Sequence, residues 1–220
     1  MQYVTYELTE DQYIPAIVYI GNKSTPVWCQ QNWDTGKYFE YIRGNGCGHC
    51  CTAMAARLHG INIDPHQEFE LCRNLWGNPI KSEEKVQDNW ISVSGIIKIL
   101  SHLNIPSSYY GVPENTDTAV QHIMDSLSEG KQVIFASVPS PKYPFPENPF
   151  SRHSHYVLCA GFSKDGKIVV ANSSKNATAF IQLVDADVIA KALSYSSEPL
   201  DMTWGEMKYF SNCTGYVIVG

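Results

Sequence analysis

Residues 46–60 read GCGHCCTAMAARLHG, and they join a glycine-rich turn to a helix. The small and apolar residues over 48–59 are typical of a buried helix, and Gly60 is a stop signal after it. Cys47 stands where the turn meets the helix. A helix N-terminus favours the thiolate form of cysteine, so this position suits a nucleophile. It also suits a small buried hydrophobic residue, which is a common fate of cysteine. The local pattern leaves both interpretations open.

Strands are predicted before this helix, and further helices after it. β-Branched and aromatic residues indicate strands over 3–7 and 14–20. A turn-rich link over 21–26 and an irregular segment over 27–46 complete the first part of the chain. Asp64 followed by Pro65 is typical of a helix start, and that helix is expected to end near residue 75. Two more helices are predicted over 94–103 and 117–129.

The hydrophobic pattern then changes from helix to strand. Strands are predicted over 132–138, 155–162, 167–172 and 178–184, a helix near 185–194, and a last strand over 215–219. Helices followed by strands indicate an α+β fold with a mostly antiparallel sheet. We expect a single domain over 1–220. A helical lobe would cover about 27–130, and a sheet lobe would cover about 131–220, possibly joined by the N-terminal strands 1–26.

Two polar residues stand at the ends of neighbouring predicted strands. His155 opens the apolar strand HYVLCAGF, and Asn172 ends the next one, across the turn at Asp165-Gly166. The hairpin register is expected to place residues 155 and 172 side by side. Taken alone, the first suits a half-buried structural histidine and the second a turn residue. Together with a cysteine at a helix start, they follow the Cys–His–Asn arrangement of nucleophile, base and orienting residue.

The bulk composition excludes several classes of protein. A chain of 220 residues with 44% hydrophobic and 17% charged residues is folded rather than disordered. Its net charge of −6 argues against a nucleic-acid partner or an anionic membrane surface. Seven cysteines without framework spacing favour a reducing compartment over a disulfide scaffold. With no visible signal peptide or membrane span, a cytoplasmic location is expected.

Four segments together resemble a known family. GCGHCCTAMAARLHG (46–60) resembles the Gly-Cys-Gly-Pro-Thr-Ser-x-Ala-Met segment of the bacteriocin-processing (double-glycine) peptidase-like group of papain-like cysteine peptidases. HYVLCAGF (155–162) is similar to its histidine strand, and KIVVANSS (167–174) to its Ile-x-Val-x-Asp-Pro strand. VWCQQNW (27–33) is similar to its aromatic-x-Gln-x-Asp segment. The resemblance implies a papain-like fold and a cysteine hydrolase acting on a peptide or related amide.

The same resemblance implies a role for each matching residue. Cys47 would be the nucleophile, His155 the general base and acid, and Asn172 the residue that orients His155. Gln30 would donate a hydrogen bond to the oxyanion, together with the backbone N–H of Cys47. Acyl transfer to a thioester acyl-enzyme and its hydrolysis would follow, with no metal or organic cofactor. Peptidase, amidase and acyltransferase share these residues.

The sequence departs from the family pattern at several positions. His49 and Cys50 stand where Pro and Thr are usual, and Asn172-Ser173 replaces Asp-Pro. The string Cys-Gly-His-Cys also resembles the Cys-Gly-Ser-Cys of papain, in which the second cysteine is the nucleophile, so Cys50 is an alternative to Cys47. Gln31 likewise competes with Gln30 for the oxyanion hole.

Three other hypotheses concern the same region. Cys47, Cys50, His153 and His155 have ligand types and spacing that suit zinc. A peptide-binding module of the same fold without chemistry is a second alternative. Residues 139–150 form a proline-rich segment just before His155, and its aromatic residues are expected either to shape a substrate groove or to pack against the sheet; they are Tyr143, Phe145 and Phe150.

Overall fold

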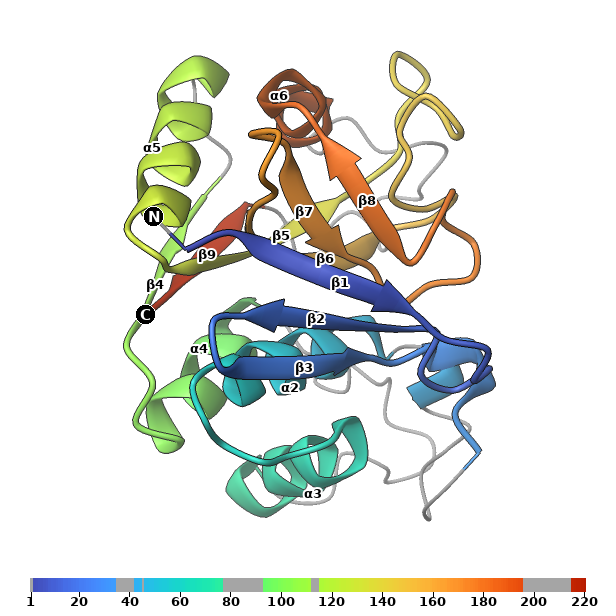
Figure 1. Cartoon of the computed structure of the whole chain (residues 1–220), viewed down its shortest axis with the longest axis vertical. Helices are drawn as coiled ribbons and strands as arrows, with labels where there is room; N and C mark the ends of the chain where they lie inside the picture. Colours follow the sequence, from blue (N-terminus) through green and yellow to red (C-terminus); the bar gives the residue numbers. More distant parts are fainter. Residues whose placement is uncertain (1, 35–41, 45, 77–92, 112–114, 196–214) are drawn as a thin grey trace.

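The computed structural model describes residues 2–34, 42–44, 46–76, 93–111, 115–195 and 215–220 (Figure 1). These residues form a six-stranded sheet in the order β4-β9-β5-β6-β7-β8 and a three-stranded sheet in the order β1-β2-β3. Every neighbouring pair of strands is antiparallel. Helices and antiparallel sheets together give the α+β class expected from the sequence.

The three-stranded sheet contains one strand that the sequence pattern missed. It comprises β1 (Val4–Leu8), β2 (Ala16–Ile20) and β3 (Lys23–Val27). The prediction of a link over 21–26 is wrong, because the chain turns at Gly21 with a φ of +60° and then pairs with β2 along β3. The polar sequence KSTPV hides the inward alternation of Thr25 and Val27, which are both buried.

The helices lie within about two residues of their predicted bounds. They are α2 (Cys47–Leu58), α3 (Pro65–Trp76), α4 (Val93–His102), α5 (Thr116–Ser128) and α6 (Ala186–Tyr195). Asp64 caps α3 as expected, because its Oδ1 accepts from the backbone N–H of Gln67 at 2.8 Å while Gln67 Oε1 accepts from the Asp64 N–H at 3.0 Å. Among the described helices, none is long and apolar enough to cross a membrane.

The six-stranded sheet is buried on both faces at its inner strands, whereas its edge strand over residues 107–110 is mostly exposed. Its strands are β4 (Ser107–Tyr110), β5 (Gln132–Ser137), β6 (His155–Phe162), β7 (Ile168–Ala171), β8 (Ile181–Val184) and β9 (Tyr216–Val219). Alternate residues of β6 join two different core clusters. Leu158 joins the core around α2 and α4, and Val157 joins the core around α5 and α6 (Figure 1). This two-sided burial explains why the strands are continuous apolar runs.

Helix α2 contacts both sheets and two other helices, α3 and α4. It packs against β3 of the small sheet and β6 of the large one (Figure 1). Its residues from Cys50 to Ala56 are all buried. The helix that begins at Cys47 is therefore held from several sides, and its first turn has a fixed position relative to the strand that begins at His155.

Candidate active site

The first turn of α2 presents a single accessible thiol. Gly46 is the residue before the helix, and Cys47 is its first residue. Gly46 is required here, because an added Cβ would collide with the carbonyl oxygen of Ile42. Cys47 is partly exposed, whereas Cys50 and Cys51 are 0% exposed. The cysteine-rich motif therefore offers Cys47, and not its neighbours, to a substrate.

Burial makes the two following thiols poor nucleophiles. Desolvation raises the pKa of Cys50 well above its usual value, and the nearby Cys47 adds to the effect. Burial also raises the pKa of Cys51 well above its usual value, and the nearby Cys47 is again the second cause. A thiol attacks as its thiolate, so both cysteines are protonated at rest and do not compete with Cys47 for a substrate. The alternative with Cys50 as nucleophile has no support from this geometry.

His155 and Asn172 are in direct contact. The Nε2–H of His155 donates to Oδ1 of Asn172 at 2.8 Å, and both residues are buried. This bond leaves Nδ1 as the proton acceptor of the neutral ring. Burial lowers the pKa of His155 to about 4, although the hydrogen bond to Asn172 acts in the opposite direction. The imidazole is therefore neutral at pH 7 and available as a base.

The register of the β6–β7 hairpin differs from the prediction. It pairs Leu158 with Ala171, so Asn172 lies beyond the end of β7 and the contact to His155 is diagonal rather than side by side. Two more hydrogen bonds hold Asn172 in place. Its Nδ2 donates to the Phe150 carbonyl at 2.8 Å, and its Oδ1 accepts from the backbone N–H of Ser174 at 3.0 Å. The side chain of Asn172 is thus fixed at both of its amide atoms.

Gln30 and Gln31 both bind the segment that follows Asn172, but in different ways. The backbone N–H of Gln30 donates to the Ser173 carbonyl at 2.9 Å, and its Oε1 accepts from the Ser173 hydroxyl at 3.2 Å. Gln31 uses both ends of its amide: Nε2 donates to Ser174 Oγ at 3.0 Å, and Oε1 accepts from the Lys175 N–H at 3.0 Å. Gln31 is thus a structural anchor, and Gln30 turns the donor end of its amide away from Ser173.

Residues 172–174 bring the candidate site residues together. Asn172 binds His155, and Ser173 binds Gln30. The Ser173 side chain also lies near the sulfur of Cys50, one turn along α2 from Cys47, and partly offsets the effect of burial on its pKa. The structure therefore gathers His155, Asn172 and Gln30 around one short segment, with the first turn of α2 against it.

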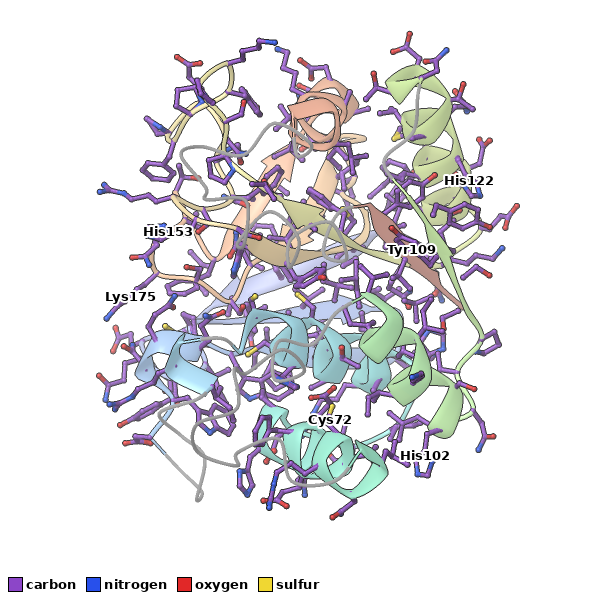
Figure 2. The ribbon with its side chains drawn as sticks, turned by 180° about the vertical axis from the view of Figure 1, so that it is seen from behind. Cys72, His102, Tyr109, His122, His153 and Lys175 are labelled. Carbon is purple, nitrogen blue, oxygen red and sulfur yellow. The ribbon has the colours of Figure 1, made fainter. Side chains whose placement is uncertain are left out.

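The zinc set considered from the sequence is not assembled in the described part of the chain. Cys50 is buried inside α2 and His155 is bonded to Asn172, whereas His153 is exposed at the outer edge of the molecule (Figure 2). Within the described ranges, a different group of side chains of metal-ligand type lies close together. Its potential ligand atoms lie within 4.8 Å of one another, and its members are His49, Glu68 and Cys72.

These three residues join α2 to α3. His49 Nδ1 contacts the Glu68 carboxylate, and the Cys72 thiol donates to Glu68 Oε1 at 3.5 Å. Figure 2 shows Cys72 between the two helices. These contacts hold the three side chains together and link the first turn of α2 to α3. The sequence analysis missed it, although Glu68 and Cys72 have the i, i+4 spacing that places two side chains on one helix face.

The proline-rich loop supplies packing at two of its three aromatic positions. Tyr143 and Phe150 are buried in the core around α5 and α6, which makes them unavailable to a substrate. Phe145 is half-buried, with the guanidinium carbon of Arg152 4.9 Å from its ring centre. The packing interpretation therefore holds for Tyr143 and Phe150.

Known proteins provide an independent comparison. The model of the Peptidase_C39 like family matches residues 24–209, a span that includes all the candidate site residues. None of the curated proteins shows a significant match. Among solved structures, a protein provisionally described as a C39-like peptidase from Bacillus anthracis superimposes with a TM-score of 0.45 and 12% identity, over 80% of this chain and 88% of that chain. The family match and the α+β architecture confirm the fold and the family expected from the sequence.

Proposed function

We propose, from the premise that this chain belongs to the Peptidase_C39-like family, that it is a cysteine hydrolase of peptides or related amides. Membership of the family supports a function of the cysteine-peptidase type. The finer proposal is that Cys47 is the nucleophile, His155 the base, Asn172 the residue that orients His155, and Gln30 an oxyanion donor. The observation that carries it is the buried His155–Asn172 hydrogen bond of 2.8 Å.

The first half-reaction forms a thioester. Nδ1 of His155 takes the proton of the Cys47 thiol, and the sulfur attacks the substrate carbonyl carbon. Negative charge then develops on the carbonyl oxygen. The backbone N–H of Cys47 belongs to the first turn of α2, whose N–H groups point out of the helix end, and we propose that it donates to this oxygen. Gln30 Nε2 is the second donor. His155 returns the proton to the departing amine.

The second half-reaction releases the product. Neutral His155 removes a proton from a water molecule, which attacks the thioester carbonyl, and collapse of the intermediate frees the acid and the Cys47 thiol. Asn172 accepts the Nε2–H throughout, and this keeps Nδ1 directed as the base. A base whose pKa is lowered to about 4 by burial is unprotonated at neutral pH, as both steps require.

The accessibility of the thiols supports the choice of nucleophile. Cys47 is partly exposed, and Cys50 is buried with a raised pKa. The six described cysteines are all thiols, which supports the reducing, cytoplasmic setting that we propose for the chain. The substrate partner we propose is a peptide or amide, with no role for nucleic acid or membrane.

A chromogenic acyl ester tests the proposal without knowledge of the natural substrate. A short-chain p-nitrophenyl ester should give a burst of nitrophenol and an acyl adduct on Cys47, detected by peptide mass spectrometry. We expect no burst from Cys47→Ala and a normal burst from Cys50→Ala, which serves as the matched control. A burst that survives in Cys47→Ala but is lost in Cys50→Ala would transfer the nucleophile to Cys50.

A further inference from the structure

The nucleophile we propose shares the first turn of α2 with a second cysteine. Residues 47–50 read Cys-Gly-His-Cys, a C-x-x-C motif, and they begin at the first residue of the helix. The two thiols differ in access, since Cys47 is partly exposed and Cys50 is 0% exposed. One accessible and one buried thiol in a C-x-x-C motif at a helix N-terminus form the arrangement that thiol–disulfide chemistry uses.

We propose that Cys47 and Cys50 are a redox-active pair, in which oxidation of Cys47 by a small-molecule disulfide leads to a reversible Cys47–Cys50 disulfide. The consequence for activity rests on the proposed function, because a disulfide at Cys47 removes the nucleophile. The pair itself does not depend on that function. It makes Cys47 a site of reversible oxidation in addition to a site of acylation.

The helix places the two sulfurs within reach of each other. Residues three apart on a helix have Cβ atoms roughly 5–6 Å apart. A disulfide needs a Cβ separation of about 3.5–4.5 Å and tolerates Cα separations of about 4.4–6.8 Å. The two Cβ atoms must therefore approach by roughly 1–2 Å for the bond to close. Of the two residues between the cysteines, Gly48 has no side chain, and the side chain of His49 contacts Glu68 of α3.

The exchange proceeds in two steps that balance. The Cys47 thiolate attacks one sulfur of the small disulfide, releases one thiolate, and becomes a mixed disulfide. The Cys50 thiol then attacks the Cys47 sulfur, and its proton passes to the departing sulfur of the second small thiol as the Cys47–Cys50 bond closes. The protein pair loses two electrons and two protons, and the small disulfide becomes two thiols. Excess small thiol reverses both steps.

The surroundings favour Cys50 over Cys51 as the second partner. The Ser173 side chain lies near the Cys50 sulfur and partly offsets the effect of burial on its pKa, which favours the thiolate character that the exchange needs. Cys51 is equally buried, and its sulfur lies near those of Cys47, Cys50 and Cys159. It is therefore the matched control for a buried cysteine close to Cys47.

Oxidised glutathione is the probe. The full chain is incubated with it, quenched with acid at intervals, and mapped by peptide mass spectrometry. The wild type and Cys51→Ala should show a brief glutathione adduct on Cys47, followed by a disulfide between residues 47 and 50 that dithiothreitol reverses. In Cys50→Ala the adduct should persist at least about tenfold longer, because no resolving thiol remains. Melting curves verify that each variant is folded.

Three results would overturn the proposal: a stable glutathione adduct on the folded wild type, a disulfide of Cys47 with Cys51 that forms in Cys50→Ala and is absent from Cys51→Ala, or absence of any reaction at Cys47. Because the measurement needs no substrate, its outcome is separate from the ester burst. A disulfide without a burst would leave the redox pair standing and remove the hydrolase. A burst without a disulfide would do the reverse.

Discussion

At the scale of single residues, burial sets the protonation state of His155. The ring is inside the protein with one hydrogen bond, and burial lowers its pKa from 6.5 to about 4. A resting thiolate–imidazolium pair is therefore disfavoured before substrate binds. We expect His155 to act as a neutral base that takes the Cys47 proton when attack begins. This assignment has consequences for stability and for rate.

The stability consequence is a loss of folding free energy in acid. Between pH 6.5 and pH 4 the unfolded chain binds a proton at His155 that the folded chain does not, so the free energy of unfolding falls as pH falls through this window. The 2.5-unit difference corresponds to about 3 kcal/mol. Urea unfolding at several pH values measures the slope, and His155→Gln should flatten it. Burial also lowers the pKa of His59, so part of the pH dependence of the unfolding free energy should remain in this variant. An unchanged slope in His155→Gln would refute the buried neutral state.

The rate consequence concerns the two adjacent glutamines. Gln30→Ala should lower kcat by about 10²–10³, because an oxyanion donor is lost. Gln31→Ala removes comparable bonds to residues 174 and 175 but no donor to the oxyanion, so its kcat should change only a few-fold, roughly the effect of a disturbed anchor. Steady-state kinetics of both variants on the ester or on a peptide decides between them. Equal losses would mean that both residues serve only the loop.

The residue pattern predicts the candidate residues of this site, and their roles stay predictions. Cys47, His155 and Asn172 were chosen because a helix start and two strand ends are rigid positions, and the structure brings the last two together. The side-by-side pairing of residues 155 and 172 is wrong because β6 and β7 pair Phe162 with Ile168 and, after a bulge between Cys159 and Gly161, Leu158 with Ala171. No local pattern signals this register. The choice between Gln30 and Gln31 required the bonds to residues 173–175.

At the scale of elements, the position of α2 depends on the close approach of Gly46 to the Ile42 carbonyl, just before the helix begins. A Cβ at Gly46 would collide with the Ile42 carbonyl, whereas one at Gly44 would meet nothing within 4 Å. Gly46→Ala should therefore displace the start of α2, lower the melting temperature and reduce the reactivity of Cys47. Gly44→Ala is the matched control in the same turn. Differential scanning fluorimetry and Cys47 labelling measure both effects, and equal behaviour of the two variants would contradict the packing argument.

The bounds of helices were predictable where a capping residue, proline or glycine stands at the helix end. Helix α3 begins at Pro65 after the Asp64 cap, and Gly130 follows α5, so their bounds came from backbone chemistry. Strands β3 and β4 were missed for different reasons. Strand β3 is a polar stretch with an internal Pro26, and β4 is a mostly exposed edge strand. Strand β3 forms by pairing with β2, and β4 forms by pairing with β9. Such pairing depends on the tertiary fold and is not visible in the local sequence pattern.

At the scale of the whole molecule, the six-stranded sheet joins two cores. One core contains α2 with Cys50 and Cys51, and the other contains Cys159. Because adjacent residues of the same strands line the two faces, we expect them to unfold together. The sequence predicted that the strands are buried, but not that helices α5 and α6 would cover the second face. The single-domain assignment over 1–220 stays a prediction.

Cysteine accessibility in urea tests this coupling. Cys50, Cys51 and Cys159 should become reactive to a maleimide over the same range of urea concentration, since the thiols of both cores are exposed only by global unfolding. Phe135→Ala, in the core around α5 and α6, should lower the free energy of unfolding by about 3–5 kcal/mol. It should shift all three thiols equally. A shift confined to Cys159 would show that the two cores unfold separately.

The central claim is that Cys47 is the nucleophile and His155 its base. The most direct measurement is the rate of iodoacetamide labelling of each cysteine between pH 5 and pH 9, by peptide mass spectrometry, in the wild type and in His155→Ala. We expect Cys47 to label fastest of the seven cysteines, and to slow at least about tenfold at pH 6 in the variant. Fastest labelling of another cysteine, or a Cys47 rate that does not depend on His155, would contradict the account.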